Sequence, residues 1–355
     1  MRKTIAKIYL KNIRENAQAF ALLTGKKICA VVKANAYGHG AEEVVCALSG
    51  VADCFAVSLY SEAVAIKTAA CGKDVLILTP PLSQEEAYLS AKNGFVLTVP
   101  DLWTARLIMG VATEYKLPVR VHIKTNTGMN RYGMNASMLG KVCKLFRSCP
   151  LVQVEGLFSH LYTNTKQGAK TQRKLFLHMQ TVCKRYFPNV LCHLSATYGA
   201  LLGKDYVFDM TRIGIGLYGY LPDGARDLEE STLFALRLKK GMRVYAYAQN
   251  NRTYRFGGAG YGKAQTPLEL GEKLSVIRFG YADGFLRRKD NGVFAFENNV
   301  NNLCMDACLR KGGAMRGKLV PVMTDAAETA KATGTISYEV LCAASRRAEM
   351  VYEYE

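Results

Sequence analysis

The chain has 355 residues, of which 49% are hydrophobic and 21% are charged. This length suits one large barrel or two ordinary domains, and the composition is that of a globular protein. The sequence has no run of about 18 apolar residues, and Lys7 interrupts the N-terminal segment where a secretion signal would need an apolar core. We therefore expect a cytoplasmic chain that does not contact membranes.

The charge balance is strongly basic, with 47 Lys and Arg residues against 29 Asp and Glu residues and a net charge of +18. Such a balance suggests nucleic acid or an anionic surface as a partner. The densest basic runs, residues 237–243, 285–290 and 309–318, are not interleaved with aromatic residues as a base-stacking surface would be. A solvated basic surface is the favoured interpretation, so we expect no nucleic-acid partner, and a nucleic-acid-binding module remains an alternative.

The eleven cysteines are odd in number and include no CxxC pair. Cys304 and Cys308 are close enough in sequence to bind one metal ion together, but no His or second Cys pair accompanies them. This usage is typical of reduced, buried thiols, so we expect neither a disulfide framework nor a metal site.

Eight short β-branched runs recur in the first two-thirds of the chain, each followed by a stretch with helical periodicity. This alternation predicts a parallel sheet covered by helices, and eight units in about 210 residues match a (β/α)8 TIM-type barrel in number and length. A doubly wound open sheet would use the same alternation. The runs are residues 28–33, 55–58, 75–79, 95–99, 119–124, 152–158, 190–195 and 213–219.

The pattern changes after residue 223 to short alternating strands at residues 233–240, 242–249 and 274–282, separated by Gly-rich turns. This texture predicts a mainly antiparallel β domain. We expect the barrel to span residues 11–225 and the C-terminal β domain residues 226–355, with residues 1–10 adding a strand to the latter.

Lys33 stands at the end of the first run, in AVVKANAYGHG, where its amine would emerge at the mouth of the barrel. An amine partly withdrawn from water can act as a nucleophile, although the pattern alone also fits a surface lysine. AVVKANAYGHG resembles the pyridoxal-phosphate lysine motif of the alanine racemases, and the resemblance extends from about Ile5 to Arg347. It implies a barrel with a C-terminal β domain, pyridoxal 5'-phosphate as cofactor, Lys33 as its attachment point, and Tyr37 as a contact of its phosphate.

The fifth run leads into HIKTNTGMNRYGM, which is similar to the KxDTGMxRxG segment of this family. By that resemblance Arg131 contacts the phenolic oxygen of the cofactor and the carboxylate of the substrate, a role that suits a guanidinium fork. Lys124 matches a lysine that is carbamylated in many members. Asn126 stands where the family usually has Asp, which removes a negative charge but retains hydrogen-bonding groups.

Three later segments, LFSHLY, HLSAT and FDMTRIGIGLYGY, also resemble family motifs. They imply that His160 supports the pyridine ring, that Thr197 binds the phosphate through its hydroxyl, and that Gly214 and Ile215 offer backbone N–H groups to it. Arg212 would donate to the pyridine nitrogen. Because a guanidinium keeps this nitrogen unprotonated, racemisation is favoured over transamination.

The C-terminal residues implied by the resemblance act in a neighbouring copy of the chain. Tyr261, in GGAGYG, matches a catalytic tyrosine that enters from the partner subunit, so Lys33 and Tyr261 would be bases on opposite faces of the substrate. Tyr281, Met305 and Asp306 match the wall of the substrate pocket that the partner supplies. A homodimer with shared active sites follows.

Two departures from the family weaken the specificity assignment. The stretch between Tyr281 and Met305 is shorter than usual, and Arg346 stands where several members carry a tyrosine. The resemblance implies a two-base racemase that interconverts L- and D-alanine and supplies D-alanine for peptidoglycan. A serine or broad-specificity amino-acid racemase is the alternative, and a non-catalytic pyridoxal-phosphate-binding protein is a further one.

Overall fold

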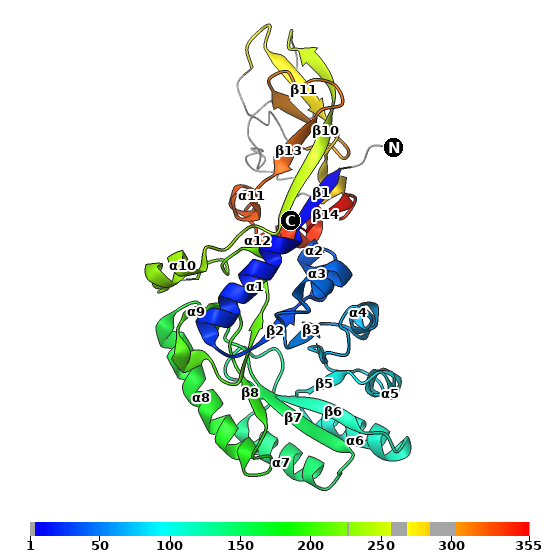
Figure 1. Ribbon diagram of the computed structural model, residues 1–355, viewed down its shortest axis with the longest axis vertical. Coiled ribbons are helices and arrows are strands. Elements are labelled where there is room, and N and C mark those ends of the chain that lie inside the picture. Colours follow the sequence, from blue (N-terminus) through cyan, green and yellow to red (C-terminus); the bar gives the residue numbers. More distant parts are fainter. Residues whose placement is uncertain (1–3, 226, 257–267, 285–302, 355) are drawn as a thin grey trace. The chain divides into compact units, whose positions relative to one another are not determined.

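The structure, a computed structural model, describes residues 4–225, 227–256, 268–284 and 303–354. Its internal contacts divide the chain into two compact units. We call the larger the barrel unit and the smaller the β unit (Figure 1). The barrel unit comprises Ile13–Ala34 and Ala41–Lys239, and the β unit comprises Met1–Asn12, Asn35–Gly40 and Lys240–Glu355.

The barrel unit contains eight parallel strands in the order β8-β7-β6-β5-β4-β3-β2-β9. The backbone closes the ring beside the two end strands, where Asp209 N–H donates to Cys192 O at 2.9 Å and Arg212 N–H donates to Ser195 O at 3.0 Å. The expectation of an eight-stranded barrel is therefore confirmed. The strands are β2 (Lys27–Val31), β3 (Cys54–Val57), β4 (Val75–Ile77), β5 (Val96–Val99), β6 (Val119–Lys124), β7 (Val152–Phe158), β8 (Leu191–His193) and β9 (Met210–Ile213).

Helices alternate with these strands and cover them from outside, as the ribbon shows for α4 to α8 (Figure 1). In α7 the buried residues Leu139, Val142, Cys143 and Phe146 follow helical spacing, and the side chain of Asn135 caps the first turn by accepting from Met138 N–H at 3.0 Å. The helices are α1 (Leu10–Thr24), α3 (Ala41–Leu48), α4 (Tyr60–Ile66), α5 (Gln84–Lys92), α6 (Leu102–Glu114), α7 (Ala136–Arg147), α8 (Lys166–Lys184), α9 (Thr197–Leu201), η1 (Lys204–Tyr206) and α10 (Glu230–Leu236).

Two predicted strands are wrong in detail. The eighth run, expected at residues 213–219, ends as a strand at Ile213 and continues as the short helix η2 (Ile215–Tyr218). A Cβ on Gly216 would lie 2.5 Å from the Phe20 ring, so this tight turn depends on glycine. Residues 233–240 were expected to form a strand, but Glu230–Leu236 form helix α10, whose first turn carries an acidic residue that the helix dipole favours.

The β unit is built around the long strand β10, which pairs antiparallel with β1, β11 and β13, while β1 also pairs parallel with β14. The expected mainly antiparallel β domain is confirmed. Its elements are β1 (Ile5–Tyr9), β10 (Met242–Thr253), β11 (Lys273–Ile277), η3 (Tyr281–Asp283), β12 (Cys308–Lys311), β13 (Leu319–Met323), α11 (Ala326–Thr333), α12 (Ser337–Ala344) and β14 (Glu349–Glu353).

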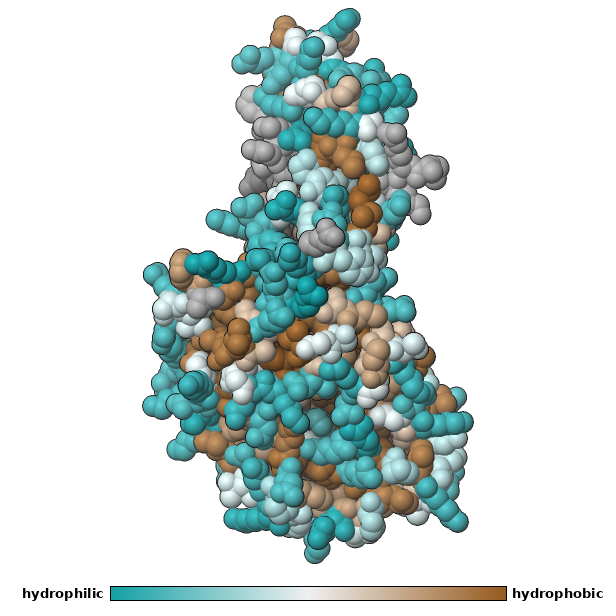
Figure 2. Space-filling model, viewed as in Figure 1, coloured by the Kyte–Doolittle hydropathy of each residue, from teal (hydrophilic) through white to brown (hydrophobic). Residues whose placement is uncertain are grey.

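On the face seen in Figure 2, hydrophilic residues are spread over both units, with hydrophobic residues interspersed among them. Within the described ranges, no helix combines the length and the apolar character needed to cross a membrane.

Candidate active site

Polar and cationic side chains gather where the barrel strands end. Lys124, Phe158 and His193 are the last residues of β6, β7 and β8 and lie side by side in register. His160 follows two residues after Phe158, and Arg212 lies in β9. Because carboxyl ends of parallel strands meet at one end of a barrel, the topology brings together residues that are up to 88 positions apart, from Lys124 to Arg212.

Arg212 is the most deeply held cation of this group, with 3% of its surface exposed. Its Nη1 donates to His193 Nδ1 at 2.8 Å and to His193 O at 3.1 Å. Its Nη2 donates to Ser159 O at 2.7 Å and Leu194 O at 3.1 Å, and lies 3.4 Å from His160 Nδ1. A guanidinium has five N–H groups, so these bonds use both terminal nitrogens and leave the Nε–H as the donor for a ligand. Burial lowers the pKa of Arg212 to about 10, and the group stays protonated at neutral pH.

Lys124 is buried, and its Nζ lies 4.3 Å from the centre of the Phe158 ring. Burial, followed by the positive charges of Arg212, Arg131 and Lys33, lowers the pKa of Lys124 to about 7. A substantial fraction of this amine is therefore neutral near pH 7. A neutral lysine amine is nucleophilic.

His160 lies beside the guanidinium of Arg212. Burial, followed by the charges of Arg212, Lys124, Arg131 and Lys33, holds its pKa well below the ordinary range. His160 is therefore neutral and presents a flat, uncharged ring at the strand ends, as support for an aromatic ligand requires.

Arg131 is exposed in the loop that follows β6. Asn126 organises this loop: its Oδ1 accepts from Gly128 N–H at 2.9 Å and from Asn130 N–H at 3.2 Å. Gly133 returns the chain with a φ of +110°, and a Cβ there would meet the backbone of Thr125 at 2.5 Å. Asn126 thus supplies the hydrogen bonds that the usual Asp would offer in this turn, without its charge.

Two short helical turns lie near each other beyond β8 and β9. The Thr197 hydroxyl, at the start of α9, accepts from Gly216 N–H at 3.3 Å, and η2 begins at Ile215 directly after Gly214. The Thr197 hydroxyl keeps its own proton available for donation. Together with the Arg212 Nε–H and the neighbouring cations, this donor set fits an anionic, phosphorylated heteroaromatic ring such as pyridoxal 5'-phosphate.

The chain leaves β2 through an unusual turn. The short helix α2 comprises Lys33–Gly38. Four of its residues have φ between 51° and 53°, in the left-handed region: Ala34, Asn35, Ala36 and Tyr37. Such a conformation costs L-residues roughly 1–2 kcal/mol each and is most often found at functional sites. The carboxylate of Glu62 accepts from Ala34 N–H at 2.7 Å, which fixes the backbone directly after Lys33.

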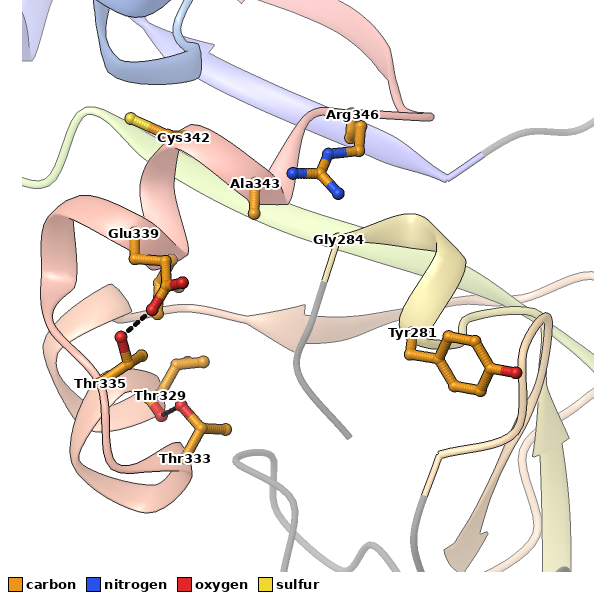
Figure 3. A pocket seen from close by; sticks show the side chains of 10 residues that line it. Tyr281, Gly284, Thr329, Thr333, Thr335, Glu339, Cys342, Ala343 and Arg346 are labelled. Atoms are coloured by element: carbon orange, nitrogen blue, oxygen red, sulfur yellow. Dashed lines mark hydrogen bonds between the residues drawn. The ribbon is translucent and has the colours of Figure 1, made fainter. Parts of the chain in front are cut away.

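Tyr37 belongs to the β unit, where its ring lies 5.9 Å from that of Tyr338, and burial raises its pKa. Also in the β unit, Tyr281 and Arg346 line a cavity of about 210 Å³, with Glu339 and three threonines opposite Tyr281 (Figure 3). Met305 is exposed.

Asp306 accepts from Arg347 Nη1 at 2.8 Å, which ties its carboxylate to a neighbour within the same chain. Tyr261 lies outside the described residues. The described structure therefore gathers the predicted barrel residues, while Tyr37, Tyr281, Met305 and Asp306 belong to the β unit.

The sequence motif HLSAT contains His193 but gave it no role, and Phe158 was not predicted as part of this site. Phe158 stacks on His193 with ring centres 4.8 Å apart and an interplanar angle of 9°, and His193 accepts from Arg212. The available signal was positional, because both residues stand at the carboxyl ends of predicted strands.

The chain matches a family model for the N-terminal domain of alanine racemase over residues 8–222 and one for its C-terminal domain over residues 247–352. It is 32% identical over 302 residues to an alanine racemase of Francisella philomiragia subsp. philomiragia (83% of this chain, 80% of that protein). It is 28% identical over 382 residues to one of Chlorobaculum tepidum (98% and 94%).

Solved structures agree with these matches. An alanine racemase of Clostridium difficile 630 superposes with a TM-score of 0.88 at 28% identity, covering 100% of this chain and 96% of that one. A biosynthetic alanine racemase of Pseudomonas aeruginosa gives 0.86 at 26% identity, covering 100% of both chains. The resemblance seen in the motifs is thereby confirmed: this chain belongs to the alanine racemase family.

Proposed function

We propose that this protein is a pyridoxal 5'-phosphate-dependent racemase that interconverts L- and D-alanine and supplies D-alanine for peptidoglycan. Full-length relatives that carry the name alanine racemase support the reaction. The observation that carries the proposal is the guanidinium of Arg212, buried and fully bonded through both terminal nitrogens, with Nε–H as its remaining donor.

The cofactor supplies an aromatic system that withdraws electrons from the Cα of a bound amino acid. Arg212 Nε–H would donate to the ring nitrogen and His160 would support the ring. Thr197, with the backbone N–H groups of Gly214 and Ile215, would hold the phosphate at the start of η2. Tyr37 would add a hydroxyl to the phosphate site.

Racemisation needs a proton to leave one face of Cα and another to arrive on the opposite face. Lys33 would take or deliver the proton on one face and Tyr261 of a second copy on the other. Arg131 would bind the substrate carboxylate, and Tyr281, Met305 and Asp306 of that second copy would close the pocket. These roles imply a homodimer with shared sites.

Lys124 would carry a carbamate. Its neutral amine would attack carbon dioxide, forming an N–C bond and releasing one proton, and the resulting anion would face the Arg131 guanidinium. The amine is prepared for this step because its pKa is lowered to about 7.

Serine is the second candidate substrate. The observation that favours it is Arg346, whose charged side chain lines a cavity together with Glu339 and three threonines (Figure 3), at a position where several family members have tyrosine. We also propose a cytoplasmic location, because the cysteine usage is typical of reduced thiols, and a boundary near residue 225 between the barrel domain and the C-terminal domain.

The decisive experiment follows the loss of the Cα proton in D₂O. Purified, cofactor-loaded protein is incubated with L-alanine and, separately, L-serine, and exchange is followed by NMR and chirality by derivatisation. We expect deuterated D-alanine, with slower conversion of serine. Exchange without inversion would mean that Tyr261 does not reach the substrate. Bound cofactor without any exchange would favour a non-catalytic binding protein.

A further inference from the structure

A second histidine stands behind the pair formed by Arg212 and His193. His122, on β6, is 8% exposed, and its Nδ1 lies 3.0 Å from His193 Nε2. The two rings have centres 5.0 Å apart and cross at 66°. The hydrogen bonds thus run from Arg212 through His193 to His122, from β9 across β8 to β6.

The barrel makes room for this ring by omitting a side chain on the intervening strand. His122 is paired with Gly156 of β7, and the ladder shifts register just before this pair. A Cβ on Gly156 would lie 2.4–2.5 Å from three ring atoms of His122. The ring therefore lies directly against Gly156 and reaches past it to His193.

The position of each proton follows from the guanidinium. Arg212 can only donate, so His193 Nδ1 must accept and must carry no proton. His193 therefore bears its proton on Nε2 and donates it to His122 Nδ1, which accepts in turn. His122 is then neutral, with its own proton on Nε2.

The surroundings keep both rings neutral. Burial, together with the positive charges of Arg120 and Arg212, lowers the pKa of His122 to about 3. The carboxylate of Asp74 acts in the opposite direction but is outweighed. Burial and the charges of Arg212 and Lys124 hold the pKa of His193 well below its ordinary value.

We infer that His122 is a positioning residue for the proposed active site: by accepting the Nε2 proton of His193, it holds His193 in the tautomer that orients Arg212 toward the cofactor ring nitrogen. Without this acceptor the buried Nε2–H of His193 is unsatisfied, and the ring gains by rotating or by moving its proton to Nδ1. Either change removes the acceptor of Arg212 Nη1. This inference rests on the proposed cofactor site, but its first test does not.

The first test is NMR of the full-length chain labelled with ¹⁵N-histidine, which is tractable because the chain has only five histidines. His193 and His122 should both appear as neutral Nε2–H tautomers across neutral pH, with the resonances assigned from the His122→Asn variant. A His193 that is charged, or that carries its proton on Nδ1, would overturn the inference whether or not the chain binds pyridoxal 5'-phosphate.

The second test measures the pyridoxal 5'-phosphate dissociation constant of the chain after removal of bound cofactor. His122→Phe keeps a flat ring without an acceptor. We expect about tenfold weaker binding, because the hydrogen bond from the charged Arg212 to His193 is loosened. His122→Asn places an amide oxygen near the Nδ1 position and should stay within about threefold of wild type. His178→Asn, on the exposed face of α8, is the matched control and should change nothing.

Unchanged binding by His122→Phe, or equal losses in His122→Phe and His122→Asn, would mean that His122 only fills space. If His122→Phe does not fold, the tautomer of the wild-type chain and the affinity of His122→Asn decide. A wild-type chain that binds no pyridoxal 5'-phosphate would defeat the proposed function and leave the tautomer measurement valid.

Discussion

The two units of the chain organise their candidate functional residues in opposite ways. In the barrel unit, Lys124, Phe158, His193 and Arg212 come from four strands and lie within direct contact of their neighbours. In the β unit, Tyr281 lines a cavity and Asp306 is bonded to Arg347. The barrel unit thus assembles a site within one chain, whereas Tyr281 and Asp306 of the β unit acquire their proposed roles only beside a second copy.

The largest expected effect comes from removing the two proposed bases one at a time, Lys33 from the barrel unit and Tyr261 from the second copy. Lys33→Ala and Tyr261→Phe should each lower racemisation by more than about a thousandfold, because each removes one of two bases. When the two variants are refolded together, half of the dimers are mixed and each mixed dimer holds one intact site. Turnover should then return to about a quarter of the wild-type value.

Lys27→Ala, at the opposite end of β2 from Lys33, serves as the control and should keep full activity. Failure of the mixture to recover any turnover, with both variants folded, would mean that the bases come from one chain. The contrast between the units would then be wrong.

The next effect is a pH dependence of stability confined to the barrel unit. Lys124 releases its proton at about pH 7 in the folded chain, while the unfolded chain holds it up to its ordinary pKa of 10.5. Between these values the unfolded state binds more protons, so raising the pH favours the folded state. The free energy of unfolding of cofactor-free protein in CO₂-free buffer should rise by about 3 kcal/mol from pH 7 to 9.5.

Lys124→Met should abolish this rise, whereas Lys144→Met, on the exposed side of α7, should retain it. Denaturant unfolding at a series of pH values measures the difference. If the free energy of unfolding depends on pH in the same way in wild type and Lys124→Met, the Lys124 amine is hydrated and has its ordinary pKa.

The smallest effect concerns packing at the barrel strands. Gly156→Ala places a methyl group against the His122 ring and should lower the free energy of unfolding by about 2 kcal/mol. Gly140→Ala, in α7, meets nothing within 4 Å and should stabilise the chain by up to about 1 kcal/mol. Equal effects of the two substitutions would mean that His122 does not lie against Gly156.

The amino-acid sequence was sufficient to predict the alternation of strands and helices. Apolar runs such as Val96–Val99 and amphipathic patterns such as that of α7 report burial locally, so the number and order of barrel strands could be read from them. The motifs added Lys33, Lys124, Arg131, His160 and Arg212 as candidates. Local propensity failed at residues 213–219 and 233–240, where glycine-dependent turning and a helix replaced predicted strands.

The contacts between these residues, and the arrangement of their protons, follow from the folded barrel and could not be predicted from the sequence. The contact of His122 with His193 spans 71 positions and depends on strand order, on register and on the missing side chain of Gly156. No local pattern encodes such a contact, because hydrogen bonds between distant residues exist only once the barrel has closed. The same closure withdraws Lys124 from water and so lowers its pKa.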